Sequence, residues 1–89
     1  MGRMDLSTVE QVEIAAQTGA PDALFELGLL YCTGRDVTQD LVTAHKWFNL
    51  AAMRGNRAAL EYRLELAREM TREQVAEAQR EARDWLTRH

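Results

Sequence analysis

The chain has 89 residues, of which 46% are apolar and 28% are charged, with a single proline and a formal net charge of -3. This length suits one domain, and the composition is typical of a folded helical protein, which excludes a disordered chain. The acidic balance predicts no general attraction to nucleic acid or to an anionic membrane surface.

Capping signals predict where the first two helices begin and end. Ser7 and Glu10 form a capping box at the start of a first helix, because each side chain can satisfy a free backbone N–H group there. Gly19 can adopt the left-handed conformation that closes this helix. Pro21 then starts a second helix over residues 21–33, since proline loses no hydrogen bond at a first helical position.

The third helix is predicted after the longest break in the apolar pattern, TGRDVTQD at residues 33–40. Gly55 ends this helix. Its apolar positions recur at spacings of three and four, at Leu41, Ala44, Trp47, Phe48, Ala51 and Ala52. His45 lies outside this stripe and is predicted to be exposed.

Two more helices are predicted, one capped by Asn56 and one opened by a second capping box of Thr71 and Gln74. In the fourth helix the predicted apolar stripe is Leu60, Leu64 and Ala67, with Tyr62 and Leu66 beside it. In the fifth helix the predicted buried residues are Val75, Ala78, Ala82 and Trp85. Trp47 and Trp85 are expected to be core anchors between neighbouring hairpins.

The stretch AAQTGAPDAL at residues 15–24 returns thirty-six residues later as AAMRGNRAAL at residues 51–60. In both copies small residues finish one helix, a glycine turns the chain and an Ala-Leu pair starts the next helix. A two-helix repeat of this length is typical of an α-solenoid, in which each hairpin buries its apolar face on a neighbour. The polar outer face of the fifth helix suits a terminal cap.

The repeated unit resembles the Sel1-like repeats, which are relatives of the tetratricopeptide repeat. The matching positions run in order through Ala16, Gly19, Ala23, Leu27, Gly28, Tyr31, Gly34, Val37, Asp40, Ala44, Trp47, Phe48, Ala51, Ala52 and Gly55. One departure is Asp36, where the family usually has a second loop glycine. Aspartate tolerates the left-handed backbone better than most residues, so the loop is expected to keep its shape.

The resemblance implies an all-α fold, a short right-handed superhelix of antiparallel helical hairpins with about five helices. We expect a single domain over residues 1–89. Within it we expect a partial half-repeat at 5–19, a full repeat at 20–55 and a degenerate capping repeat at 56–89. The leading Met and the capped last helix suggest either a whole gene product or a C-terminal fragment of one.

The resemblance also implies a role as an adaptor or scaffold for protein complexes, often in bacteria, and no chemistry. In tetratricopeptide domains the first helix of each hairpin lines the concave face. Carried onto this sequence, the predicted partner-binding residues are Asp22, Phe25, Leu29, Glu61, Glu65 and Arg68.

Such a groove would have an apolar end at Phe25 and Leu29 and an acidic end at Glu61 and Glu65. It would accept a peptide or helix with an apolar anchor and a Lys or Arg. The alternative is that the two apolar residues pack under the first helix and that the glutamates are only solvated.

No pattern in the sequence predicts a catalytic, cofactor or metal site. His45 has no second histidine near it, and Cys32, the only cysteine, has no evident base and suits a small apolar filler. Gly28 lies inside a helix and no phosphate-loop lysine follows it. We therefore predict a non-enzymatic protein-interaction module. The alternatives are a homodimeric structural solenoid subunit and, more remotely, a small helical hydrolase.

The expected location is the cytoplasm. A single cysteine excludes an internal disulfide and fits a reducing compartment. The start MGRMDLSTVE has no apolar leader, and the sequence contains no run of 18 apolar residues. Gly2 does not begin a myristoylation motif, because Leu6 stands where that motif needs Ser or Thr.

Overall fold

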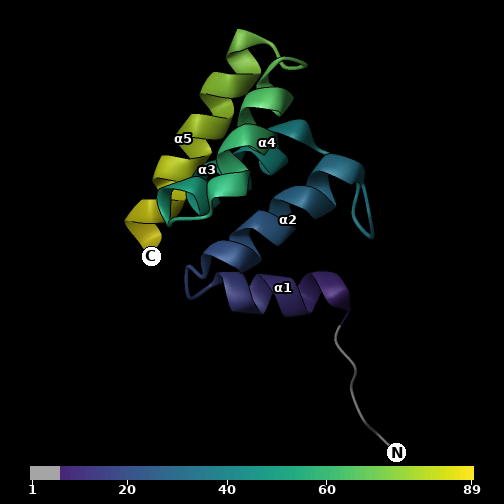
Figure 1. Ribbon diagram of the computed structural model, residues 1–89, viewed down its shortest axis with the longest axis vertical. Helices are drawn as coiled ribbons and strands as arrows, with labels where there is room; N and C mark the ends of the chain where they lie inside the picture. The colour runs from purple at the N-terminus through teal and green to yellow at the C-terminus, as the bar shows by residue number, and fades with distance from the viewer. Residues whose placement is uncertain (1–6) are drawn as a thin grey trace, which may run out of the picture.

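A computed structural model describes residues 7–89 of the chain. This part contains helices and no strand, and each helix runs antiparallel to the one before it (Figure 1). The helices are α1 (Thr8–Ala16), α2 (Pro21–Thr33), α3 (Leu41–Met53), α4 (Arg57–Ala67) and α5 (Arg72–Arg88). The predicted all-α fold is confirmed. The first two residues of the expected half-repeat, and Gly2, lie outside the described residues.

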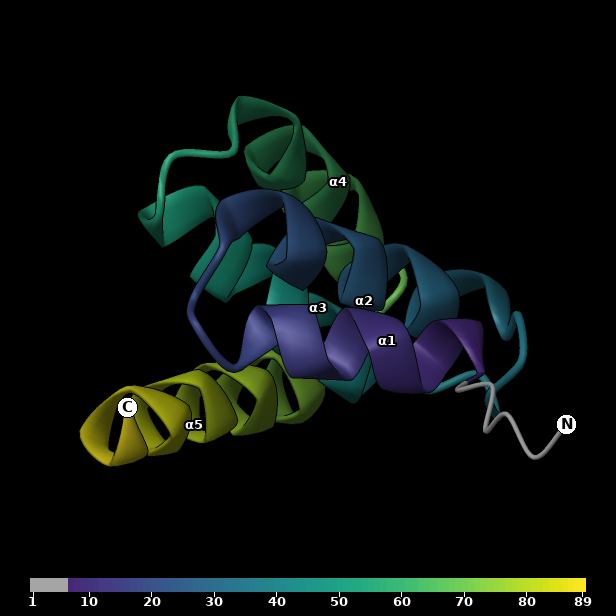
Figure 2. The same ribbon diagram turned by 90° about the horizontal axis from the view of Figure 1, so that it is seen from below.

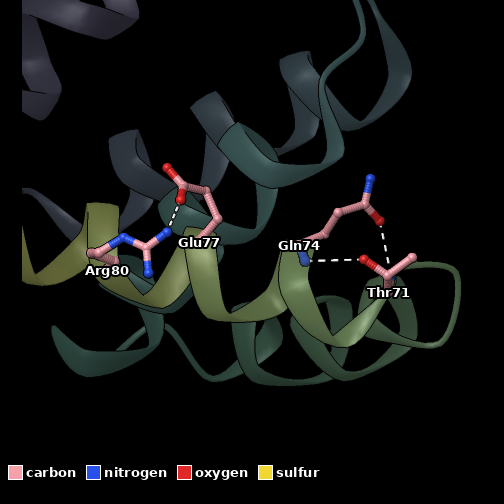
Figure 3. A network of polar contacts seen from close by, with 4 residues as sticks. All are labelled: Thr71, Gln74, Glu77 and Arg80. Carbon is pink, nitrogen blue, oxygen red and sulfur yellow. Dashed lines mark hydrogen bonds and ion pairs between the residues drawn. The ribbon is translucent and has the colours of Figure 1, made fainter.

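Both predicted capping boxes are present. The Glu10 backbone N–H donates to Ser7 Oγ at 3.1 Å, and the Ser7 backbone N–H donates to the Glu10 carboxylate at 2.9 Å. Thr71 and Gln74 make the same reciprocal pair at the start of α5, as Figure 3 shows. These local bonds satisfy N–H groups that a helix start leaves free, which explains why the helices begin where the sequence predicts.

The two copies of the repeated stretch, residues 15–24 and 51–60, form equivalent turns between helices. Gly19 follows α1 with a φ of 80°, and Gly55 follows α3 with a φ of 109°. Residues other than glycine rarely adopt these values, which explains the glycine in both copies. Asp36 also has a positive φ, of 64°, so it takes the left-handed conformation that the family usually gives to glycine.

The core lies mainly between α2 and α3, which form the tightest hairpin of the described chain. Gly28 is buried in the middle of α2, and a Cβ atom there would overlap the ring of Phe48 on α3. The absence of a side chain therefore lets the two helices approach closely. The largest fully buried side chains are Phe48, Leu24, Leu27 and Leu50.

The second hairpin is more open than the first. In Figure 2, α4 and α5 lie on either side of α3, and α5 packs along α3 rather than along α4. Leu64 on α4 is thirty-six residues after Gly28 and occupies the equivalent position of the repeat. Leu64 is exposed, so the close contact that Gly28 makes with α3 has no counterpart at this position of α4.

The predicted stripe of α4 is wrong in two of its residues. Leu60 and Leu64 are exposed, whereas Ala59 and Leu66 are the buried residues of this helix. Helical spacing fitted both pairs, since Leu60 and Leu64 are four residues apart and Ala59 and Leu66 are seven residues apart. The position of α3 decides which pair is buried. The prediction for α5 holds for Ala78, Ala82 and Trp85, which are buried against the rest of the molecule.

The prediction of an exposed His45 is also wrong, because only 3% of its surface is exposed. α3 is surrounded by α2, α4 and α5, so it buries more than the single stripe that its apolar residues predict. The two tryptophans link α3 to α5, as predicted, through an edge contact with ring centroids 6.2 Å apart. Trp85 is buried and Trp47 is half-buried.

Candidate protein-binding surface

The first helices of the two hairpins, α2 and α4, are joined at their starts and at their middles. The Asn56 side-chain amide, which caps α4, donates to the Asp22 carboxylate of α2 at 3.1 Å. One turn further on, the rings of Phe25 and Tyr62 meet edge to face with centroids 5.1 Å apart. The two helices therefore present one shared surface, to which Asp22 and Phe25 both contribute.

Phe25 does not pack under α1, as the alternative reading supposed. Its ring lies 5.7 Å from the ring of Phe48 and contacts Tyr62, so it belongs to a cluster formed by α2, α3 and α4. Phe25 is half-buried, and the Tyr62 side of the cluster is open to solvent. The Phe25 ring is therefore held near the surface by packing against the rings of Phe48 and Tyr62.

Glu61, Tyr62 and Glu65 line a shallow pocket of about 210 Å³ on α4. Both glutamates are exposed. Arg68 forms an exposed ion pair with Glu65, with 3.6 Å between Arg68 Nη1 and Glu65 Oε1. Glu61 is therefore the stronger anionic position of the two, because the Arg68 guanidinium partly neutralises the charge of Glu65.

Leu29 is half-buried and lines a separate depression of about 190 Å³, together with Glu26, Arg35 and two further residues. Asp22 and Phe25 on α2 and Glu61 and Glu65 on α4 therefore contribute to one surface, with Arg68 paired to Glu65 just after α4. Leu29, also on α2, lines the neighbouring hollow. Tyr62 is the member that the sequence missed as a surface residue. Its repeat equivalent is Glu26, so the repeat carried no aromatic signal there.

Three titratable groups on or near α3 have pKa values shifted by burial. Burial and the charge of Arg63 lower the pKa of His45, and its Nδ1 has no hydrogen-bond partner in the described structure. Burial, with a smaller effect of Glu69, raises the pKa of Cys32, which favours the protonated thiol over the thiolate. Burial lowers the pKa of Lys46, whose ammonium lies 4.3 Å from the centre of the Trp47 ring.

Between Ser7 and His89, no three His, Cys, Asp or Glu side chains are grouped so that they could hold a metal ion. None of the five helices is both long and apolar enough to cross a bilayer.

Comparison with protein families finds a Sel1 repeat over residues 21–56, which matches α2, α3 and the corner that follows them. The resemblance inferred from the sequence is confirmed. Comparison with curated proteins and with solved structures gave no significant match. Sel1 repeats generally mediate contacts between proteins.

Proposed function

We propose that this chain, which contains a Sel1 repeat, is a non-enzymatic protein-interaction module. It binds a peptide or helix on the joint surface of α2 and α4. The observation that carries this proposal is the contact of Phe25 with Tyr62 beside the pocket of Glu61 and Glu65. An aromatic pair next to carboxylates is the kind of surface that anchors a partner.

The partner proposed for this surface has one apolar side chain and one Lys or Arg a turn or two away. The apolar group would cover the open side of Tyr62 and the exposed part of Phe25. The cation would meet Glu61, with Asp22 as a further carboxylate at the other end of the surface. A cationic side chain at Glu65 would have to displace Arg68, so we expect Glu61 to contribute more affinity than Glu65.

The cytoplasm remains the proposed location, because the single cysteine suits a reducing compartment. A bacterial source remains proposed from the resemblance to Sel1-like repeats. A structural role through association of copies of this chain remains the second candidate, favoured by the exposed leucines of α4. A hydrolase is the least supported, because the buried His45 has no nucleophile or carboxylate partner among the contacts of the described residues.

The test uses charge reversal at exposed positions, which leaves the aromatic cluster intact. Wild type and a Glu61→Lys, Glu65→Lys variant are used as baits in a native lysate, and the retained proteins are identified by mass spectrometry. The matched control is Glu73→Lys, Asp84→Lys, which reverses two exposed carboxylates of α5.

A protein retained by wild type and by the control, and lost by the α4 variant, supports the proposed surface. A crosslinkable residue at position 62 should then attach to that protein. If all three baits retain the same proteins, the α2–α4 surface is not the binding site.

A further inference from the structure

A second surface lies on a flank of α4, beside the end of α3. Leu60 and Leu64, one turn apart on this helix, are 43% and 55% exposed, and Met53 at the end of α3 is 59% exposed. We call these three residues the end face. A hollow of about 500 Å³ opens here, lined in part by Met53, Arg57 and Leu60.

The repeat explains what is missing from the end face. Leu24 and Gly28 of α2 are the equivalents of Leu60 and Leu64, and in the first hairpin both are buried, with α3 packed directly over Gly28. In the second hairpin, α5 lies along α3, so none of the helices between residues 7 and 89 covers the corresponding side of α4. The end face therefore has the shape and the apolar character of a site for one more helix.

The charges around the end face indicate what kind of helix would fit. Two arginines, Arg57 and Arg63, line the hollow together with one carboxylate, Glu61, so the hollow carries a net positive charge. A helix with acidic side chains beside an apolar one would be complementary to this surface.

The other end of the molecule offers such a helix. α1 lies at the end of the stack away from α4 (Figure 1), and its Ile14 is 58% exposed. Glu10 is one turn before Ile14 and therefore lies on the same side of the helix. Residues 7–33, which include α1 and α2, contain four acidic residues and no lysine or arginine.

We propose that the end face of one copy binds α1 of a second copy, head to tail. Ile14 would enter the hollow beside Met53 and Leu60, and Glu10 would approach Arg57. A two-fold pairing of two end faces is disfavoured, because it would bring the same arginines of both copies together. The head-to-tail contact leaves one free end on each side, so it builds open chains of copies rather than a closed dimer.

Two variants with neutral polar substitutions test this arrangement, and each removes one side of the contact. Ile14→Gln alters α1 only, and Leu60→Gln, Leu64→Gln alters the end face only. All the changed side chains are exposed, so each variant is expected to fold, which circular dichroism will check. Ala76→Gln, an exposed change on α5, is the control.

Sedimentation velocity at low ionic strength should show that the average mass of wild type and control rises with concentration beyond that of a dimer. Each variant alone should associate at least about tenfold more weakly. An equimolar mixture of the two should form a species of twice the 10.2 kDa chain mass and nothing larger, since one intact α1 meets one intact end face.

Three results would overturn the proposal. One is a wild type that stays monomeric at every concentration. Another is an Ile14→Gln variant that associates as wild type does, which would indicate a two-fold contact of end faces. The third is a mixture with no 1:1 species. Added salt should weaken the wild-type association, because exposed charges are screened.

Discussion

Gly28 of α2 and Phe48 of α3 are packed so closely that a Cβ atom on Gly28 would overlap the phenylalanine ring. Both residues are buried, so neither side can move aside without disturbing the core. This single contact sets the distance between the two helices of the Sel1 repeat. In the second hairpin Leu64 takes the place of the glycine and is exposed, so this contact has no counterpart there.

The first prediction concerns this contact. Alanine at the middle of a helix is normally more stable than glycine by about 0.5 to 1 kcal/mol. We expect Gly28→Ala to reverse this sign and to lower the free energy of unfolding by about 1 to 3 kcal/mol, because the added methyl group overpacks the core. Urea denaturation measures the change.

The control for this prediction is Leu64→Ala, at the equivalent position of the second hairpin. Because Leu64 is exposed, we expect this change to alter the free energy of unfolding by only about 0.5 kcal/mol. A Gly28→Ala protein at least as stable as wild type would contradict the assigned contact.

The second prediction concerns Trp85, which attaches α5 to α3. Its ring contacts Trp47 and stacks on His89 with centroids 3.9 Å apart, and the side chain is buried. We expect Trp85→Ala to lower the free energy of unfolding by about 3 to 5 kcal/mol, a large part of the stability of a domain of this size. Trp85→Phe should recover more than half of that loss in the free energy of unfolding. An unchanged melting temperature in Trp85→Ala would contradict the assignment.

The third prediction concerns pH and His45. Burial and Arg63 lower the pKa of His45 in the folded state, so the unfolded chain binds a proton more readily. The stabilising effect is complete above the unfolded pKa, about 6.5, and is lost as the pH falls below it. We expect the free energy of unfolding to decrease below this pH by at most about 1.4 kcal/mol per pH unit.

A His45→Gln variant provides the comparison for the pH prediction, since it removes the titrating ring and keeps a polar side chain. Its free energy of unfolding should depend less on pH than that of wild type over the range in which histidine titrates. Equal pH dependence in the two proteins would show that His45 titrates alike in the folded and unfolded states.

The fourth prediction concerns the capping box of α5. Thr71 Oγ1 accepts the Gln74 backbone N–H at 3.1 Å, and Figure 3 shows this pair together with the Glu77 and Arg80 side chains one turn further along. Thr71→Ala should cost about 0.5 to 2 kcal/mol of stability, whereas Thr71→Ser should be nearly neutral because it keeps the hydroxyl. Thermal unfolding followed by circular dichroism distinguishes them. Equal losses would mean that the hydroxyl does not cap the helix.

The sequence alone was sufficient for the helices, because their ends depend on local chemistry. Ser7, Pro21, Asn56 and Thr71 each act on backbone groups within a few residues, so their positions predict where helices begin. Repeated glycines likewise mark turns that need a positive φ. The resemblance of residues 21–56 to a Sel1 repeat could be recognised for the same reason, since the repeat is a pattern of such local signals.

For the candidate surface, the sequence identified the right helices but not all the right residues. The position of a residue in the repeat placed Phe25 and Glu61 on neighbouring helices. It could not assign Tyr62, because whether an aromatic ring on α4 is core or surface depends on the distance and direction of α2. The contact between Phe25 and Tyr62 joins residues far apart in the chain.

Which face of a helix is buried was decided only by tertiary packing. The spacing of apolar residues on α4 allowed either Leu60 and Leu64 or Ala59 and Leu66 to face inward, and only the placement of α3 between α4 and α5 selects the second pair. The same placement buries His45. Local sequence determines a helix through bonds between near neighbours, whereas burial depends on which distant segments can approach, and here the placement of α3 between α2, α4 and α5 made that difference.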